Sequence, residues 1–439
     1  MSPLDGSEGI DLKRSLLVTA VISSLVAAAC TSPPDSTTST IAVTTTSTSP
    51  PTTTSEPAVS TGIGVEGDVI RLGVMVPRSG PVAAFGDALL TGQEAYWTYV
   101  NEVLGGVGGV FAVELTVFDH RFDPDEAVEG YDLLQGEVLG ISGSIGTLID
   151  ERIAPLAASD GVLAMAGSLS SQWVGHPAIL PNLLLPTYRD QVAAGLDWAV
   201  ESGLTTKTAI LFQEGDYGED CLTGYDRAIA GGAAENVARV GHPPAATDFG
   251  NVVGQLFASS ADSVIVCTTP DALVRIIATA DSLGFQPNWL VSAQSVDAGV
   301  PTGLGGDAGP EAGLAALQNT WVLGAGPPAD SPARFLIEDV FSNVEGANWY
   351  SLLGYAQAAT FHLILEEAVE SFNLTRSGLQ AAAGRLESLD LGLGGPLSSL
   401  VAGVPVGGSA AGIVTVDSLT DPFGIPASEP YFPSPFGNE

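Results

Sequence analysis

From residue 69 onward, short apolar runs alternate with amphipathic helical patterns, and this alternation restricts the possible folds more than any other feature. The run Val69–Val76 (VIRLGVMV) is almost continuously apolar, as is typical of a strand buried on both faces of a parallel sheet. Strand–helix–strand units at this spacing predict parallel sheets with helices on both faces. Because the chain runs on to residue 439, too far for one open sheet, we predict an α/β fold with two lobes.

Cap and turn residues indicate where the helices begin. Asp123 is a good N-cap residue, and Pro124 suits the first helical position. Asp125 and Glu126 then place negative charge in the first turn. Further helices are expected at residues 87–103, 150–158 and 190–202. Strands are expected at residues 113–118, 138–141, 162–165, 208–212, 263–267 and 289–292.

Charge and composition exclude several classes of function. The chain has 14 Lys and Arg against 50 Asp and Glu, a formal net charge of -36, which repels phosphate backbones and argues against nucleic acid as a partner. Three cysteines are too few for a disulfide scaffold or a Cys-based zinc cluster. The four histidines include no HExxH motif. We therefore expect no metal and no cofactor.

Residues 1–29 have the pattern of an export signal. Lys13 and Arg14 precede an uncharged stretch at residues 15–29, which is short for a membrane span. The small residues directly before Cys30 resemble the lipobox of bacterial lipoproteins, which implies a lipid on this cysteine. We expect Cys30 to become the lipid-bearing N-terminus of the mature chain. Ordinary secretion with an incidental Cys30 is the alternative.

Residues 30–62 are predicted to form a tether. Of the 32 residues from Thr31 to Gly62, 24 are Ser, Thr or Pro, so the segment cannot bury enough apolar surface to order itself. Fully extended, it would reach roughly 100 Å at about 3.3 Å per residue. We expect a folded domain at residues 63–439, exported and held by a lipid at the outer face of the cell membrane.

Several motifs follow one another in a fixed order between residues 68 and 418. They are Ser79-Gly80-Pro81, Phe85-Gly86, DHRFDP at 119–124, GSIGT at 143–147, GVLAMAGSLSS at 161–171, TAILFQEGDYG at 208–218 and Gly395-Pro396-Leu397. Together they resemble the type I periplasmic binding proteins, specifically the branched-chain amino acid and amide receptors of ABC importers. The resemblance implies two Rossmann-like lobes with parallel sheets, joined by a hinge of three crossings.

The resemblance also implies where the lobes divide. The three crossings are expected near residues 183–189, 319–325 and 403–408. Lobe 1 would take residues of about 68–186 and 325–403. Lobe 2 would take residues of about 187–320 and 408–420. In this family a ligand is enclosed between the two lobes.

Ligand contacts follow from the resemblance, position by position. Thr147 matches a hydroxyl that contacts the ligand carboxylate in amino acid receptors, and Ser168 and Ser170 match the next loop. These residue types also cap helices, which is the alternative for all three. Small hydroxylated loops and helix N-termini suit anions and amides without a cation.

Aromatic and lobe 2 positions complete the expected contacts. Phe85 and Tyr217 match aromatic residues that cover the ligand, and Thr269 offers a further hydroxyl at a strand end. Phe85 as a core residue and Tyr217 as a surface residue are the alternatives. Gln294 stands near the position where amino acid receptors have an acidic residue for the ligand ammonium. Because a buried ammonium without a counter-charge is costly, Gln294 favours a neutral amide or urea-like ligand. Asp216 or Asp297 could supply the charge instead.

Cys221 and Cys267 are the cysteines left after Cys30. Export favours oxidation, and the expected topology brings both to one edge of the second sheet, so a disulfide is a fair hypothesis. Two buried thiols acting as small apolar side chains are the alternative.

The leading hypothesis is a solute-binding lipoprotein that captures a small polar ligand (an amino acid, an amide or a urea-like molecule) and delivers it to an ABC permease. We expect it to act as a monomer. A ligand sensor for a signalling partner would have the same kind of pocket. An exported hydrolase is disfavoured, because the sequence has no GxSxG, P-loop or GxGxxG motif. A structural module of the cell wall is a further alternative.

Overall fold

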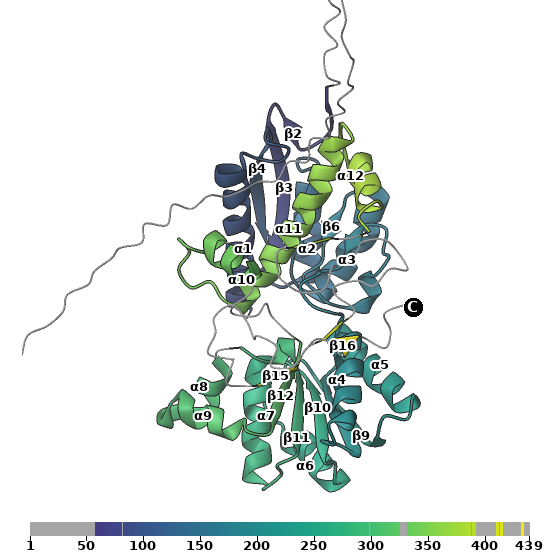
Figure 1. The fold of residues 1–439 in the computed structure, drawn as a ribbon, viewed down its shortest axis with the longest axis vertical. Helices are drawn as coiled ribbons and strands as arrows, with labels where there is room; N and C mark the ends of the chain where they lie inside the picture. Colours follow the sequence, from purple (N-terminus) through teal and green to yellow (C-terminus); the bar gives the residue numbers. More distant parts are fainter. Residues whose placement is uncertain are drawn as a thin grey trace, which may run out of the picture. The chain divides into compact units, whose positions relative to one another are not determined.

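A computed structural model of the protein describes residues 58–80, 82–297, 299–324, 332–387, 389–391, 410–411, 413–415 and 432–433. The described residues form two six-stranded sheets, each flanked by helices (Figure 1). Both sheets are parallel except for one antiparallel strand in each, Val65–Glu66 (β2) and Ile413–Thr415 (β15). The prediction of an α/β fold with two parallel sheets is therefore confirmed.

The first sheet is built around β3 (Val69–Val76), the apolar run that opened the pattern. β3 has eight residues, and the five at its C-terminal end are all buried. This burial is why the run is almost continuously apolar. The strand order is β2-β3-β5-β6-β7, and β4 also pairs with β3. The remaining strands are β4 (Ala112–Asp119), β5 (Gly140–Ser144), β6 (Ala164–Met165) and β7 (Ile179–Leu180).

Helices from two distant parts of the chain cover the first sheet. The early ones are α1 (Ala83–Tyr99), continued by a π-helix (Val100–Leu104), α2 (Pro124–Leu134), α3 (Thr147–Asp160) and the short 3-10 helix η2 (Ser171–Trp173). The later ones are α10 (Pro332–Val340), α11 (Trp349–Glu370) and α12 (Arg376–Ala383). The described chain thus contributes helices to the first sheet again from residue 332 onward. The lobe boundaries themselves stay a prediction.

The packing of α1 against α11 depends on two glycines. A Cβ at Gly92 would lie 1.9 Å from the Ser351 carbonyl oxygen, and one at Gly354 would lie 2.0 Å from the Leu89 carbonyl oxygen. Only glycine allows the two helix backbones to approach so closely. This contact fixes the late helix α11 on the first sheet.

The second sheet has the strand order β15-β12-β11-β10-β8-β9. Its strands besides β15 are β8 (Lys207–Gln213), β9 (Glu235–His242), β10 (Ser263–Cys267), β11 (Asn288–Ser292) and β12 (Thr320–Leu323). Its helices are α4 (Tyr188–Glu201), α5 (Asp216–Ala230), α6 (Gly250–Ser259), α7 (Pro270–Ser282), η3 (Ala293–Ser295), α8 (Gly299–Gly305), η4 (Gly306–Ala308) and α9 (Pro310–Ala316). All five residues of β10 are buried, so its apolar sequence SVIVC again reflects burial on both faces.

Two small pairings involve the ends of the described chain. β1 (Ser60–Thr61) pairs in parallel with β13 (Asn373–Leu374), and β14 (Ala410–Ala411) pairs with β16 (Phe432–Pro433). The tether was expected to end at residue 62, whereas Ser60 and Thr61 already belong to the folded part. A partly buried Val59 packed on the core explains this difference.

The cap predictions can be compared with the structure directly. The Asp123 side chain accepts hydrogen bonds from the backbone N–H groups of Asp125 and Glu126 at the start of α2, so the predicted N-cap is confirmed. The helix expected at 87–103 begins four residues earlier, at Ala83, and ends as a π-helix. Gly105, with φ 82°, terminates it, in line with the expected glycine stop.

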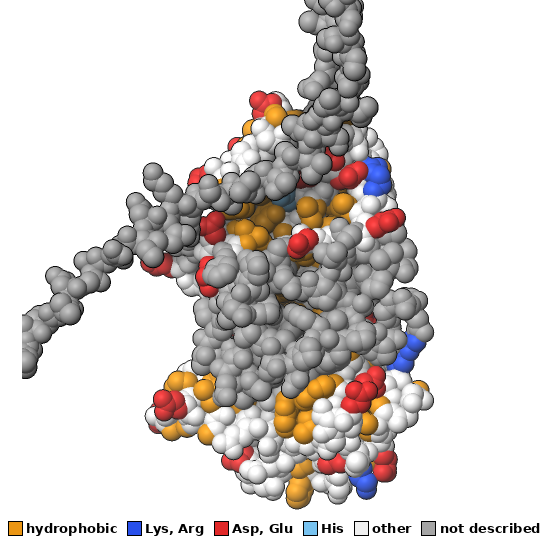
Figure 2. All heavy atoms as spheres, in the orientation of Figure 1, with side chains coloured by type: hydrophobic (Ala, Val, Ile, Leu, Met, Phe, Trp, Pro, Cys, Tyr) orange, Lys and Arg blue, Asp and Glu red, His pale blue; other side chains and the backbone are white. Residues whose placement is uncertain are grey.

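The surface reflects the acidic composition. Figure 2 shows Asp and Glu side chains spread over the visible described residues, with Lys and Arg at few places. Apolar side chains are exposed singly or in small groups, which is normal for a folded protein. Among the residues that the structure describes, no helix combines the length and apolar character needed to cross a bilayer.

Candidate ligand-binding site

Three predicted contact residues lie together at the C-terminal ends of β5 and β6. Thr147 is the first residue of α3, and its hydroxyl donates to the Ser168 Oγ at 3.2 Å. The Ser168 Oγ also accepts from the backbone N–H of Ser170 at 3.0 Å. Ser168 and Ser170 belong to the segment 167–172, called the serine loop below. The structure therefore brings Thr147, Ser168 and Ser170 into one hydrogen-bonded group.

A buried carboxyl group on α3, a helix that covers the first sheet, lies at the start of the serine loop. Asp150 of α3 has 1% of its surface exposed, accepts from the Ser144 hydroxyl, and is hydrogen-bonded to the backbone N–H groups of Gly167 and Ser168. Burial raises the pKa of Asp150 to about 8, against the lowering effect of these hydrogen bonds. The sequence reasoning missed this residue, because one Asp inside a helix carries no signal of its own.

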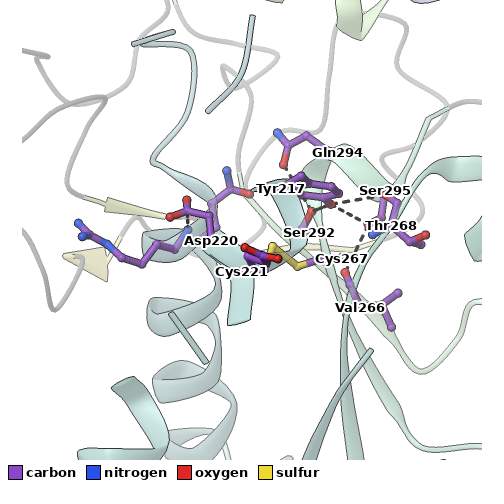
Figure 3. Close-up of a disulfide and its surroundings, with 12 residues drawn as sticks. Tyr217, Asp220, Cys221, Val266, Cys267, Thr268, Ser292, Gln294 and Ser295 are labelled. Atoms are coloured by element: carbon purple, nitrogen blue, oxygen red, sulfur yellow. Dashed lines mark hydrogen bonds between the residues drawn. A yellow bond between two sulfur atoms is a disulfide. The ribbon is translucent and has the colours of Figure 1, made fainter. Parts of the chain in front are cut away.

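Tyr217 occupies the corresponding strand end in the second sheet. It lies in the first turn of α5, directly after β8, and its hydroxyl contacts the hydroxyls of Ser292 and Ser295 and the Thr268 carbonyl (Figure 3). The distance to the Ser295 Oγ is 3.3 Å. A Cβ at Gly218 would lie 1.8 Å from the Gln213 carbonyl oxygen, so glycine there lets the first turn of α5 rest on the end of β8.

Asp216 joins the two strand-end groups. Its Oδ1 accepts from the Ser170 hydroxyl at 3.1 Å and from the Gln172 Nε2 at 2.6 Å. The Asp216 Oδ2 is buried and has no hydrogen-bond partner among the described residues. The sequence reasoning considered Asp216 only as a substitute for Gln294, whereas the structure places it at the centre of the group.

The electrostatic environment of Asp216 is negative. The pKa of Asp216 is raised to about 6, first by burial and also by the neighbouring carboxylates of Asp220 and Glu151, while the Ser170 and Thr147 hydroxyls act in the lowering direction. The hydroxyl of Ser170, one of the expected ligand contacts, is thus directed at a carboxylate of the protein itself. A hydrogen-bond donor on a ligand would find the Asp216 Oδ2 unoccupied by other donors.

Gln294 lies on the other side of Tyr217. It is part of η3, directly after β11, and its Oε1 accepts from the Ser292 hydroxyl at 3.4 Å. Its Nε2 is buried without a hydrogen-bond partner among the described residues. An unpaired buried donor and an unpaired buried acceptor, on Gln294 and Asp216, therefore flank the same tyrosine.

Four aromatic rings accompany these polar groups. The ring centroids of Phe85 and Tyr350 are 4.5 Å apart, and those of Tyr188 and Tyr217 are 4.6 Å apart. Burial raises the pKa of Tyr350, and Asp297, Tyr217 and Tyr188 raise it further, so Tyr350 lies within electrostatic reach of all three. Phe85 and Tyr217 were expected contacts. Tyr188 and Tyr350 were missed, because they lie outside the strand-end loops, at the starts of α4 and α11.

Thr269 has a local structural role. Its side chain accepts from the Ala272 N–H at 3.4 Å and caps α7, and it is exposed. No hydrogen bond in the described part of the chain joins it to Tyr217 or Gln294. Its neighbour Thr268 is buried and contacts the His242 Nε2 at 2.8 Å. A ligand contact by Thr269 stays a prediction.

Cys221 and Cys267 form a disulfide in the structure, with their Cα atoms 6.6 Å apart (Figure 3). The bond joins the second turn of α5, one turn after Asp216 and Tyr217, to the end of β10. Both cysteines are fully buried. Cys30, the expected lipidation site, lies outside the described residues, as do residues 395–397 and the third expected crossing at 403–408.

Two parallel sheets whose strand ends gather hydroxyl, carboxyl, amide and aromatic groups define a two-lobed protein of the solute-binding class. A family profile described as "Periplasmic binding protein" matches residues 69–403. The chain therefore belongs to the periplasmic binding protein family, and its fold is of type I.

Individual relatives agree with this assignment. The "Leu/Ile/Val-binding protein homolog 3" of Brucella melitensis is 26% identical over 198 residues, which cover 44% of this chain and 53% of that protein. The chain thus spans about half the length of the curated relatives it matches.

Solved structures share the fold over most of the chain. A fatty acid ABC transporter substrate-binding protein from Thermomonospora curvata has a TM-score of 0.76 at 25% identity, covering 86% of this chain and 96% of that one. A branched-chain amino acid ABC transporter from Thermus thermophilus with bound valine has a TM-score of 0.70 at 14% identity, covering 84% and 98%. The second likeness concerns the fold alone.

Proposed function

We propose that the protein is an extracytoplasmic solute-binding protein that captures a small polar ligand at this site and delivers it to an ABC importer. Membership of the periplasmic binding protein family supports this role. In this proposal residues 1–29 direct export, Cys30 carries the lipid, and residues from 31 onward form the tether. The protein binds and releases its ligand without chemical change.

The residues proposed to contact the ligand are Phe85, Thr147, Ser168, Ser170, Tyr217, Thr269 and Gln294, to which the geometry adds Asp216, Tyr188 and Tyr350. Asp216 is the observation that carries the proposal. An unpaired buried carboxylate oxygen costs free energy, and a ligand that donates a hydrogen bond to it removes that cost. The ligand is therefore proposed to carry an N–H group, as amino acids, amides and urea do.

The same environment argues against an anionic ligand without an N–H group. The largest electrostatic neighbours of Asp216 are the carboxylates of Asp220 and Glu151, which would repel a lone carboxylate. The relatives bind different molecules, since one structure contains valine and another is described as a fatty acid transporter protein. Testing amino acids against fatty acids therefore decides which of these two ligand classes this chain binds.

The test is thermal unfolding of the purified protein with a panel of amino acids, primary amides, urea, small peptides and short fatty acids. A ligand that binds only the folded state at 100 times its Kd adds about 2.7 kcal/mol to the free energy of unfolding. For a chain of this size the melting temperature then rises by a few degrees. We expect a rise with at least one N–H compound and none with fatty acids.

Asp216→Asn makes the test specific to the site. The substitution keeps the shape of the side chain and removes its charge, so we expect the ligand-induced rise to fall by at least half. Asp226→Asn, an exposed position on the same helix, serves as the matched control and should keep the full rise. A rise that Asp216→Asn leaves unchanged would remove Asp216 from the site, and a panel without any rise would contradict the choice of ligand class.

A further inference from the structure

The serine loop is contacted by carboxyl groups on helices that flank both sheets. Asp150 of α3 contacts the N–H groups at its start, and Asp216 of α5 contacts the Ser170 hydroxyl in its middle. A third carboxyl group, Asp220 of α5, contacts its end at Ser171. Asp220 belongs to none of the proposed ligand contacts, so its role needs a separate explanation.

Asp220 joins three segments of the chain. Its Oδ1 accepts from the Ser171 hydroxyl, and its Oδ2 accepts from the backbone N–H of Ser171 at 3.1 Å. The same Oδ2 accepts from the backbone N–H of Arg189 at 3.1 Å. Figure 3 shows Asp220 on α5 beside Cys221, close to the disulfide. One buried side chain, 8% exposed, thus connects α5 to the serine loop and to the start of α4.

The two N–H groups that Asp220 accepts from are both at helix starts. Ser171 is the first residue of η2, and Arg189 is the second residue of α4. N–H groups in the first turn of a helix have no partner within the helix. Their partial positive charge stabilises a carboxylate, which is why a carboxyl group can be buried here. Burial raises the pKa of Asp220, and the hydrogen bonds from Ser171 and Arg189 act in the lowering direction.

The position of Asp220 on α5 links these contacts to the site. Asp216 and Tyr217 lie one turn earlier on the same helix, and Cys221 ties the helix to the end of β10. α5 is therefore fixed against the second sheet. Asp220 on this helix reaches the serine loop, which follows β6 of the first sheet. Tyr188, whose ring contacts Tyr217, directly precedes Arg189.

We infer that Asp220 is a positioning residue, whose carboxyl group holds the serine loop and the start of α4 against α5 before any ligand binds. It thereby keeps the candidate contacts from both sheets in their mutual arrangement. Such preorganisation reduces the ordering that a ligand must otherwise bring about. The inference goes beyond the proposed function, because it requires no ligand and holds whichever molecule the site binds.

The test is amide hydrogen exchange of the full chain without ligand, followed by mass spectrometry of peptides. The N–H groups of Ser171 and Arg189 are the ones that Asp220 protects. In Asp220→Ala both lose their acceptor, so we expect exchange in peptides covering 169–176 and 187–191 to be roughly tenfold faster. Exchange in the peptide covering β3 reports global unfolding, and its rate should stay unchanged.

Two substitutions separate positioning from general stability. In Asp220→Asn the amide oxygen can accept from both N–H groups, and the amide NH₂ can donate to the Ser171 hydroxyl, so protection should be largely restored. Asp226→Ala removes a carboxylate of the same helix that pairs with Arg239 at 2.6 Å, and should leave both peptides unchanged. Equal exchange in Asp220→Ala and the natural chain overturns the inference.

If Asp220→Ala also makes exchange faster in the β3 peptide, the substitution destabilises the whole fold. The deciding variant is then Ser171→Ala. This change removes one hydroxyl from the serine loop and leaves Arg189 untouched. Since the hydrogen bonds of Asp220 join Ser171 to Arg189, faster exchange at 187–191 supports the link. Unchanged exchange there overturns it. Neither result depends on finding a ligand, so failure of the ligand panel and failure of this inference remain distinguishable.

Discussion

Asp150 shows how a single buried carboxyl group links the site to the stability of the fold. It has 1% of its surface exposed, and its Oδ2 has no hydrogen-bond partner among the described residues. Its pKa is raised to about 8, chiefly by burial and also by the nearby Asp216. The protonated form is neutral and the ionised form is not, so burial favours the proton. The group that orders the serine loop is thus itself sensitive to pH.

We predict that Asp150 makes stability fall as the pH rises. Its pKa is about 8 in the folded chain and about 3.9 in the unfolded chain, so the folded state binds the proton more tightly. Its contribution is complete below about pH 4 and is lost as the pH approaches 8. Asp150→Asn removes this dependence. Between pH 5 and 8 the natural chain should lose on the order of 1–3 kcal/mol relative to the variant.

Denaturant unfolding at pH 5, 6, 7 and 8 measures this difference. Asp226→Asn, on the exposed face of α5, is the control and should keep the pH profile of the natural chain. Parallel profiles for the natural chain and Asp150→Asn would show that Asp150 is ionised at all four pH values, contrary to the prediction.

At the scale of helices and strands, the disulfide fixes the start of α5. It joins Cys221 to Cys267 across 46 residues of sequence, and both sulfur atoms belong to fully buried side chains. A cross-link of this span removes conformational freedom mainly from the unfolded chain. It also fixes α5, one turn after Asp216 and Tyr217, to the strand that ends at Cys267.

We predict that Cys221→Ala with Cys267→Ala lowers the free energy of unfolding by about 3 kcal/mol. Denaturant unfolding under non-reducing conditions measures the loss. Reduction of the natural chain should reproduce it, while the double variant should not respond to the reductant. Unaltered stability of the natural chain, once thiol counting has shown that both cysteines are reduced, would contradict the prediction.

Whether a site residue could be predicted from the sequence depends on the helix, strand or loop that carries it. Thr147, Ser168, Ser170 and Tyr217 directly follow apolar runs, and the ends of buried strands can be read from such runs. The structure joins Thr147, Ser168 and Ser170 by hydrogen bonds, and Ser170 in turn donates to Asp216, which directly precedes Tyr217. The approach of parallel strand ends is a consequence of the fold class, so this part of the arrangement was open to prediction.

Other parts depend on contacts between distant segments. Tyr350 meets Phe85 only because α11 returns to α1 across more than 200 residues of chain, which depends on the close approach at Gly92 and Gly354. Asp220 meets Ser171 and Arg189 through the relative placement of three segments. No local pattern encodes such distances. The sequence could therefore indicate the strand-end hydroxyls but not the carboxyl groups that organise them.

At the scale of the whole molecule, the net charge of -36 is the dominant electrostatic feature. Like charges repel one another more strongly in a compact chain than in an expanded one, so the charge destabilises the folded state. Ion pairs between half-exposed side chains, such as Arg239–Asp226 and Arg275–Asp271, each offset this by less than about 1 kcal/mol. Repulsion should therefore outweigh attraction at low ionic strength.

We predict that the melting temperature rises by several degrees between 10 mM and 200 mM NaCl. Over this range the screening length falls from roughly 30 Å to below 10 Å, so repulsion between distant carboxylates is largely removed. KCl should produce the same rise, because screening depends on ionic strength and not on the identity of the cation. A response to one salt alone would indicate a specific ion site instead. A fall with both salts would mean that the ion pairs stabilise the fold more than the excess charge destabilises it.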